Sequence, residues 1–313
     1  MFAHIVDALA DYDVVLEPDE NTPEWWAGAP SVCRGDDGVW YLAARMREGR
    51  SVRGKRGYEI RILMSDDGRR YKQVHNVHRD DAGVPVFERP CLMRHPQSGK
   101  FRLYGCAGLK DGWTIIKFDD TDSPTEINPE TLAPVLAPSQ STDPFVGTIG
   151  YKDPVVLVAR GEWHMFVIGT DKTERIWHFT SGDGVEWASA SEHPVLENAG
   201  WHNYFTRPAS VVPMPLGYLF VYEGSHTRWH DPIYNIATGL AYSPDLKTFI
   251  DLTPDQPLLR STTPGDNHTW RYSHWMAVDD KMWVFWEAAR PNNTNELRVA
   301  TFDLDTIAPQ VIG

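Results

Sequence analysis

Carboxylic acids stand at repeated positions along this chain. Glu88 and Asp153 lie two residues and one residue before a proline that opens an apolar run. Glu223 and Glu287 directly follow two strongly aromatic runs. Ionisable groups in such apolar surroundings are costly unless they are paired or used for chemistry. These four side chains are therefore the first candidates for a reactive site.

Two carboxyl groups are enough to cleave a glycosidic bond, because one protonates the leaving oxygen while the other activates water or attacks the sugar. Asp153 follows a lysine, which favours an ionised carboxylate and the role of base or electrostatic modulator. Glu223 lies beside aromatic residues, where desolvation raises a carboxyl pKa and suits an acid. We take Asp153 and Glu223 as the preferred catalytic pair. Glu88, Glu287 and His274 are the reserve candidates.

Cations accompany these carboxylates. Arg89, Lys152 and Arg207 each lie one or two residues before such a proline. His274 lies at the corresponding position in the last copy of the pattern. Arginine grips carboxylate or phosphate groups through its planar fork. The cations thus favour an anionic substrate group such as a uronate, or phosphate as an acceptor. The alternative is that they only neutralise neighbouring carboxylates.

Aromatic residues near the same positions are candidates for stacking on sugars. They are Trp25, Trp26, Trp201, His202 and Tyr204. Amphipathic rings bind the apolar faces of sugars, but they also pack between strands. Both roles stay open from the sequence.

A short repeat indicates how these residues are held. Residues 65–71, 181–187 and 243–249 each read Ser-x-Asp-x-x-x-aromatic after a β-prone run. Asp and Gly supply tight turns between antiparallel strands. The three segments therefore predict three equivalent hairpins.

A longer repeat contains the first. Five anchors, Pro30, Pro90, Pro154, Pro208 and Trp275, are 60, 64, 54 and 67 residues apart. Each begins an apolar run that is followed by a turn and an aromatic strand. This spacing is typical of one four-stranded blade with its loops. We predict an all-β fold, a five-bladed β-propeller of four-stranded antiparallel blades, as a single domain over residues 1–313.

The third strand of each blade is expected to follow the aromatic one. The predicted third strands are 58–64, 113–118, 176–180, 236–242 and 297–302. Residues 5–16 are expected to supply the outer strand that closes the ring with the last blade, which removes exposed sheet edges.

Residues just before the anchors should converge on the propeller axis, because the innermost strands line it. The residues directly before the anchors are Ala29, Arg89, Asp153, Arg207 and His274. The residues one position earlier are Gly28, Glu88, Lys152, Thr206 and Ser273. This register predicts a ring of charged groups at one mouth of a funnel.

Overall charge narrows the range of partners. The chain has 30 basic and 43 acidic side chains, a formal charge of −13. Such a surface repels nucleic acid and anionic membranes. No apolar stretch is long enough to span a bilayer. We expect a carbohydrate as the partner, with no nucleic acid and no membrane; the sequence leaves the oligomeric state open.

The three cysteines, Cys33, Cys91 and Cys106, form no C-x-x-C pair and are odd in number. A disulfide framework is therefore not expected, and a cytoplasmic setting fits better. The first fifteen residues lack the basic and apolar regions of a secretory signal. Motifs for nucleotides, zinc proteases and serine hydrolases are missing from the sequence, and we expect neither a cofactor nor a metal.

With these residues in place, the blade pattern, and Lys152-Asp153-Pro154 in particular, resembles the five-bladed glycosidase superfamilies. These comprise arabinanase/xylosidase-like, invertase-like and mannoside-phosphorylase-like families. In the arabinanase-like members, carboxylates from the first three blades act as base, modulator and acid. The resemblance implies a glycosidase.

The sequence also departs from these families. Arabinanase-like and invertase-like members carry Asp at the start of blade one, where this chain has Ala29-Pro30. The Asp-Pro-Arg strand of the mannoside phosphorylases is also missing. The resemblance therefore assigns no single family.

Four functions remain open from the sequence. The first is a glycoside hydrolase acting on a small glycoside or oligosaccharide, possibly one with an anionic group. The second is a phosphorylase or transferase on the same fold. A non-catalytic sugar-binding propeller and a protein-interaction propeller are the others, because fold alone does not decide function.

Overall fold

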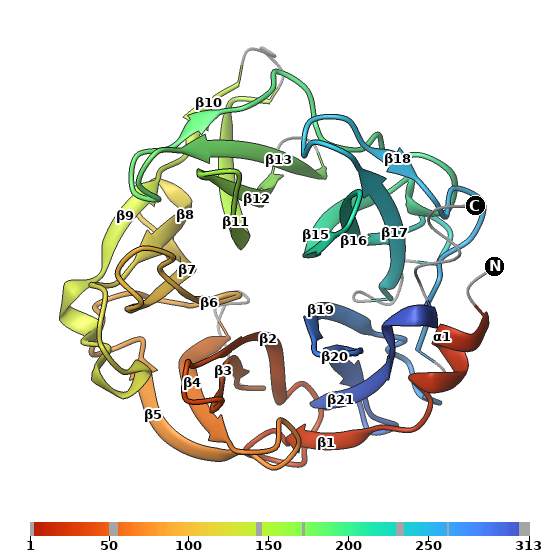
Figure 1. The fold of residues 1–313 in the computed structure, drawn as a ribbon, viewed down its shortest axis with the longest axis horizontal. Helices are drawn as coiled ribbons and strands as arrows, with labels where there is room; N and C mark the ends of the chain where they lie inside the picture. The colour runs from red at the N-terminus through yellow and green to blue at the C-terminus, as the bar shows by residue number, and fades with distance from the viewer. Residues whose placement is uncertain are drawn as a thin grey trace.

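Five blades of β-strands surround a central axis in the computed structural model, and the strands of blades five and one are joined into one continuous sheet (Figure 1). The structure describes residues 3–49, 56–141, 146–170, 173–229, 235–261 and 263–306. The five-bladed propeller of antiparallel blades predicted from the repeats is confirmed. Within the described residues, no helix is both long and apolar enough to cross a membrane.

The blades follow one another along the chain, and the innermost strand comes first in each. Blade one contains β2 (Trp26–Arg34), β3 (Trp40–Arg47), β4 (Gly57–Ser65) and β5 (Lys72–His78). Blade two contains β6 (Cys91–Arg94), β7 (Phe101–Leu109), β8 (Gly112–Lys117) and β9 (Ala133–Leu136). Blade three contains β11 (Thr148–Ala159), β12 (Glu162–Thr170), β13 (Glu174–Ser181) and β14 (Ala188–Ser189), with β10 (Ser139–Gln140) paired to β11. Blade four contains β15 (Phe205–Met214), β16 (Gly217–Ser225), β17 (Ala237–Ser243) and β18 (Ile250–Asp251).

The last blade is completed by the start of the chain. Blade five contains β19 (Trp270–Val278), β20 (Lys281–Ala289) and β21 (Asn295–Asp303), and β1 (Asp13–Leu16) pairs antiparallel with β21 as its outer strand. The predicted ring closure is confirmed for β1. The preceding residues form a short helix, α1 (Ala3–Ala8); its buried Ile5, and Leu9 directly after it, pack on blades four and five. In the described part of the chain, short 3-10 helices lie in loops: η2 (Pro124–Glu126), η3 (Pro129–Thr131), η4 (Gly200–His202) and η5 (Leu304–Thr306).

The Ser-x-Asp repeats form the predicted turns between the third and fourth strands. In blade one, Ser65 Oγ accepts a hydrogen bond from Gly68 N at 3.0 Å, and Asp67 Oδ1 accepts from Arg69 N and Arg70 N at 2.9 and 2.8 Å. Gly68 has φ +73°, a conformation that costs glycine little. Blade four places Leu246 at the same point with φ +62°. The repeat thus encodes one turn geometry.

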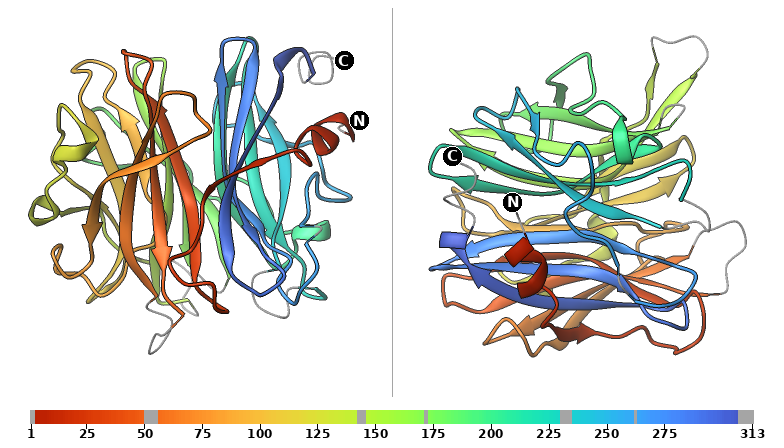
Figure 2. Two further views of the ribbon diagram at one scale, coloured as in Figure 1. Left: turned by 90° about the horizontal axis from the view of Figure 1, so that it is seen from below. Right: turned by 90° about the vertical axis from the view of Figure 1, so that its right-hand side faces the viewer.

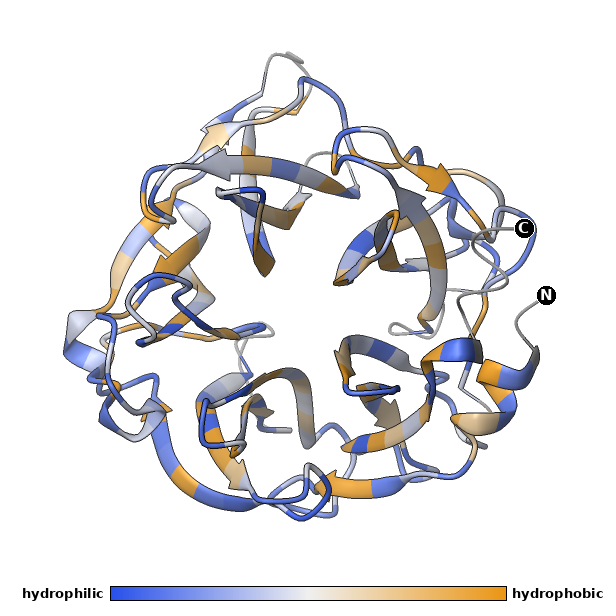
Figure 3. Ribbon diagram, in the orientation of Figure 1, coloured by the Kyte–Doolittle hydropathy of each residue, from blue (hydrophilic) through white to orange (hydrophobic). Residues whose placement is uncertain are grey.

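The hydrophobic core lies between neighbouring blades. Apolar residues colour the strands in Figure 3, while the connecting loops are largely hydrophilic. One cluster joins blades one and two through Ile60, Ile62, Phe87 and Leu103, all almost fully buried. Seen from the side, the strands of the blades run roughly along the axis around which the blades are arranged (Figure 2).

The two ends of the channel differ in their connections. The described segments from blade to blade, such as 79–90 and 190–204, lie at the end where the innermost strands begin. Hairpin turns of two residues, at 160–161 and 215–216, lie at the other end. Long loops on a rigid scaffold are where binding sites concentrate. We call the first end the mouth.

A buried histidine pair in blade three links stability to pH. His164 Nδ1 and His178 Nε2 lie 3.0 Å apart, and the His178 ring stacks on Phe166 with centroids 4.3 Å apart. Burial, with the neighbouring His164, lowers the His178 pKa to about 3. The unfolded chain therefore binds an extra proton between about pH 3 and 6.5, so stability falls as pH falls through this window.

We expect His178→Gln to flatten that dependence, because glutamine keeps a polar partner for His164 without titrating. The slope of the unfolding free energy between pH 6.5 and 4 should decrease by up to about 1.4 kcal/mol per pH unit relative to wild type. Urea unfolding at several pH values measures this. Equal slopes in the two proteins would show that the pair does not control acid stability.

Candidate active site

The mouth is organised by a bulge near the start of the innermost strands. The ladder register shifts between Gly28 and Ser31 in blade one, and between Lys152 and Val155 in blade three. Equivalent shifts occur in blades four and five. The residues at the ladder position equivalent to Gly28 form one layer, which we call the mouth ring: Gly28, Glu88, Lys152, Arg207 and Arg271.

The structural register differs from the predicted one in the last two blades. Arg207 is equivalent to Lys152, one position earlier than expected. In blade five, Tyr272 shares a positive φ with Asp153 (+52° and +58°), so His274 lies two positions deeper than expected. Trp275 is therefore no substitute for the anchor proline; Ser273 occupies that position.

His274 consequently faces the far part of the channel. It lines a cavity of about 440 Å³ at the end opposite the mouth, together with Cys91 and Val155. Burial and the nearby Arg89 lower the His274 pKa to about 3, so the imidazole is neutral. The structure thus separates His274 from the mouth ring.

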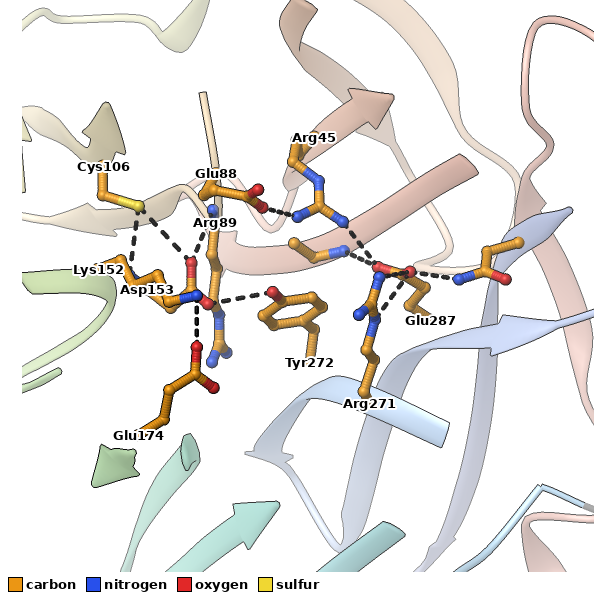
Figure 4. Close-up of polar contacts among 12 residues, drawn as sticks. Arg45, Glu88, Arg89, Cys106, Lys152, Asp153, Glu174, Arg271, Tyr272 and Glu287 are labelled. Carbon is orange, nitrogen blue, oxygen red and sulfur yellow. Dashed lines mark hydrogen bonds and ion pairs between the residues drawn. The ribbon is translucent and has the colours of Figure 1, made fainter. Parts of the chain in front are cut away.

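Glu88 is the partly accessible carboxylate of the mouth ring. Its Oε2 pairs with the buried guanidinium of Arg45, and 12% of its side chain is exposed (Figure 4). Burial opposes ionisation, but Arg45, helped by Arg47, Lys152 and Arg271, outweighs it and lowers the Glu88 pKa to about 2. Glu88 is therefore a carboxylate throughout the neutral range.

Glu287 is a fully buried junction between blades five and one. Its Oε1 accepts hydrogen bonds from Arg271 at 3.0 and 2.7 Å and from Asn295 at 2.6 Å. Its Oε2 accepts from Ala29 N at 3.1 Å and Arg45 at 3.3 Å (Figure 4). A Cβ on Gly28 would come within 1.7 Å of Oε2, which explains the glycine in the mouth ring. With both oxygens occupied, Glu287 positions its neighbours.

Asp153 is held in a similar way. Oδ1 accepts from Arg89 N at 3.2 Å and Oδ2 accepts from the Tyr272 hydroxyl at 3.0 Å (Figure 4). The Cys106 thiol lies 3.6 Å from Oδ1, and only 1% of Asp153 is exposed. Its carboxylate thus joins blades two, three and five.

Two cations of the mouth ring share a carboxylate that the sequence analysis did not single out. Glu174, at the start of β13, lies 2.6 Å from Lys152 Nζ and 2.5 Å from Arg207 Nε. Burial opposes its ionisation, but Arg207 and Lys152 lower the Glu174 pKa to about 2. Nearly a fifth of the Glu174 side chain (19%) remains exposed, so this group borders the mouth.

Glu223 differs from the other carboxyl groups. It is completely buried, its Oε1 accepts from Ser273 N at 3.3 Å, and its Oε2 has no hydrogen-bond partner. Burial raises the Glu223 pKa to about 7, although Arg89, Arg207 and Arg271 act in the opposite direction. Glu223 is therefore protonated below about pH 7 and about half protonated near it.

Arg89 is turned away from the mouth towards the blade-four backbone. Its guanidinium donates to Pro208 O at 2.9 Å and Ala209 O at 2.5 Å. The side chain is buried (2% exposed), and its guanidinium contacts the backbone of β15. Arg89 therefore joins blades two and four.

The aromatic candidates are divided between packing and the surface. Trp26 is buried among the guanidinium groups of Arg47, Arg56 and Arg271, at 4.4, 4.5 and 4.9 Å from its ring. Trp25 is half-buried beside Tyr58.

The candidates before blade four lie elsewhere. Trp201 stacks on Tyr222 and donates to Thr253 O at 2.6 Å, and His202 bonds Asp251 at 3.1 Å. Both are buried, whereas Tyr204 is 42% exposed. The structure thus gives Trp201 and His202 packing partners within blade four.

The mouth brings together the partly exposed side chains of Glu88, Glu174, Lys152 and Arg207, and the buried Glu223 is the ladder partner of Arg207. Arg45 and Glu174 were missed because they lie on second and third strands. Arg271 and Tyr272 were missed because Trp275 was the predicted anchor of blade five. Within the described residues, no group of three His, Cys, Asp or Glu side chains is arranged to hold a metal ion. The site offers acid–base chemistry and anion binding.

Solved structures share this fold. A glycosyl hydrolase from Bacteroides ovatus is 15% identical, with a TM-score of 0.71 and 94% of each chain covered. A β-1,2-mannobiose phosphorylase from Listeria innocua is 12% identical, with a TM-score of 0.69, covering 95% of this chain and 97% of that one. An α-L-arabinanase from Penicillium chrysogenum is 16% identical, with a TM-score of 0.62, covering 94% and 98%. No protein-family model and no curated sequence matches the chain. The chain is thus similar in fold to propeller glycoside hydrolases and to a glycoside phosphorylase.

Proposed function

We propose that this protein hydrolyses a glycosidic bond of a small glycoside or oligosaccharide at its mouth, with Glu88 as general base and Glu223 as proton donor. One observation carries the proposal: Glu88 of the mouth ring is an ionised, partly exposed carboxylate, and Glu223, which faces Arg207 of the same ring in the strand ladder, is a carboxyl group with a pKa of about 7. Acid–base cleavage of a glycosidic bond needs two carboxyl groups with different pKa values, so that one is ionised while the other is protonated. The fold similarity to glycoside hydrolases supports it.

The two groups have different access to substrate. Glu88 is held by Arg45 and has exposed side-chain surface, so it can activate a water molecule directly. Glu223 is fully buried, so its proton would reach a sugar oxygen through one intervening water. Asp153 and Glu287 act as positioning residues, because their oxygens are occupied by other blades.

The charges of the mouth favour an anionic substrate group. Five cations, Arg45, Arg47, Lys152, Arg207 and Arg271, lie among five carboxyl groups, Glu88, Asp153, Glu174, Glu223 and Glu287. Because Glu223 is about half protonated near pH 7, a small positive excess remains. The negative charge of a uronate carboxylate would compensate this positive excess. Phosphorolysis is the second candidate, because inorganic phosphate would compensate it as well.

A panel of aryl glycosides and oligosaccharides, neutral and uronic, tests the proposal in buffers with and without phosphate. We expect hydrolysis without phosphate, with uronides preferred. Turnover that requires phosphate would select the phosphorylase, and sugar binding without any turnover would select a non-catalytic propeller.

Glu223 gives the activity an alkaline limit. Because its protonated form is the proposed donor, kcat/KM should be constant between about pH 5 and 6 and fall tenfold per pH unit above about 7. Glu223→Gln should remove this limb and lower the rate by about 10²–10⁴-fold. A pH–rate profile of both proteins measures it. An unchanged alkaline limb in Glu223→Gln would assign the limb to another group.

A further inference from the structure

A second hollow opens at the mouth end of blade one, outside the mouth ring. It has a volume of about 350 Å³ and is lined by Asp19, Glu20, Trp25, Glu48, Tyr58, His78 and Arg79. We call it the blade-one pocket. Trp25 directly precedes β2, Glu48 follows β3, Tyr58 belongs to the start of β4 and His78 ends β5. All four therefore lie at the mouth end of the blade.

The pocket has a fixed aromatic wall. The rings of Trp25 and Tyr58 meet edge to face with centroids 6.2 Å apart, and the His78 ring lies 6.1 Å from that of Tyr58. The Tyr58 hydroxyl donates to Asp19. A Cβ on Gly49 would lie 2.8 Å from Trp25, so the backbone passes close to the indole. Rings held in this way present a preorganised apolar face.

Polar groups border the aromatic wall. Glu48 pairs with Arg79 at 2.9 Å, and Arg61 holds both oxygens of Asp19 at 2.9 and 2.8 Å. The side chains of Glu48 and Arg79 are each 23% exposed, and that of Asp19 is 41% exposed. Planar acceptors and donors around an aromatic face match a sugar, which has an apolar C–H face and a rim of hydroxyl groups.

The end of β3 connects this pocket to the mouth ring. Arg45 pairs with Glu88, Arg47 packs on Trp26, and Glu48 lines the blade-one pocket. Three residues of extended strand span roughly 10 Å. The pocket residue Glu48 is thus separated from Arg45, the partner of Glu88, by more than the width of one sugar ring.

We propose that the blade-one pocket binds a further sugar unit of the substrate whose glycosidic bond lies at Glu88, which makes the substrate class an oligosaccharide. This inference rests on the proposed function. It adds a binding subsite on blade one and a minimum substrate length.

Chain-length dependence tests it. The measured quantity is the ratio of kcat/KM for a trisaccharide to kcat/KM for the aryl monoglycoside of the same sugar. This ratio should be well above one for wild type and fall roughly tenfold in Trp25→Ala. Trp229→Ala, which alters another half-buried tryptophan at the mouth end, should keep the wild-type ratio. If Trp25→Ala does not fold, His78→Ala should lower the ratio in the same direction.

Binding separates this inference from the proposed function. Titration of an oligosaccharide series by calorimetry should show affinity that rises from one to three units in wild type and not in Trp25→Ala. That result without any turnover would keep the subsite and reject the hydrolase. Hydrolysis with a ratio near one, or a ratio that Trp25→Ala leaves unchanged, would reject the subsite and keep the hydrolase. Wild-type protein that binds no oligosaccharide of the series would overturn the subsite.

Discussion

Glu88→Gln is expected to lower kcat by about 10²–10⁴-fold, the usual cost of losing a general base. The amide keeps the size of the side chain but cannot take a proton from water. It also leaves the buried Arg45 with one fewer charged partner, while Glu287 still contacts it at 3.3 Å. Steady-state kinetics on the best substrate of the panel measures the loss.

Asp120→Asn is the matched control for Glu88→Gln. Asp120 also pairs with a buried arginine, Arg102, at 2.7 Å, and 19% of its side chain is exposed. It lies in the segment after β8, at the end of the channel opposite the mouth. Its replacement should leave kcat within twofold of wild type. Near-full turnover in a folded Glu88→Gln protein would reject Glu88 as the base and direct attention to Glu174.

Glu287→Gln is expected to have the largest effect on stability. The buried carboxylate compensates Arg45 and Arg271 and accepts the Ala29 N–H. Removing one partner of a buried ion network leaves uncompensated charge and costs about 3–5 kcal/mol. Urea unfolding should show this loss. The double variant Glu287→Met, Arg271→Met should lose less than the sum of its single variants, and strict additivity would contradict the coupling.

Local patterns were enough to predict the propeller. The Ser-x-Asp turns at Ser65, Ser181 and Ser243 are made by hydrogen bonds within four residues, so each is visible in a short window of sequence. The prolines at 30, 90, 154 and 208 are likewise recognisable in a short window of sequence, and they indicate where the innermost strands lie. The outer strand β1 was predictable because a propeller has to close its ring to remove exposed sheet edges.

The candidate site was predictable only in part. Glu88, Lys152 and Arg207 were found because they lie next to the anchors. Glu174 was not, since it begins a third strand and reaches the mouth only through its contacts with Lys152 and Arg207. The pairing of Glu174 with these cations depends on how the strands twist around the axis. The spacing of repeats in the sequence gives no information about that twist.

The misplacement of His274 has a related cause. Blade five has no proline, and the apolar Trp275 resembles an anchor in sequence, whereas the bulge occurs at Tyr272 and Ser273. The positive φ of Tyr272 marks the true register, and a positive φ is not predictable from the sequence when the residue is tyrosine.

The location of a bound sugar tests the central claim most directly. A crystal structure of Glu88→Gln with an oligosaccharide that wild type cleaves should show the scissile bond over the mouth ring. The residue-88 side chain should then lie 2.6–3.2 Å from a water that faces the anomeric carbon, the reach of a general base. A sugar bound instead in the cavity beside His274, with the mouth ring unoccupied, would contradict the account.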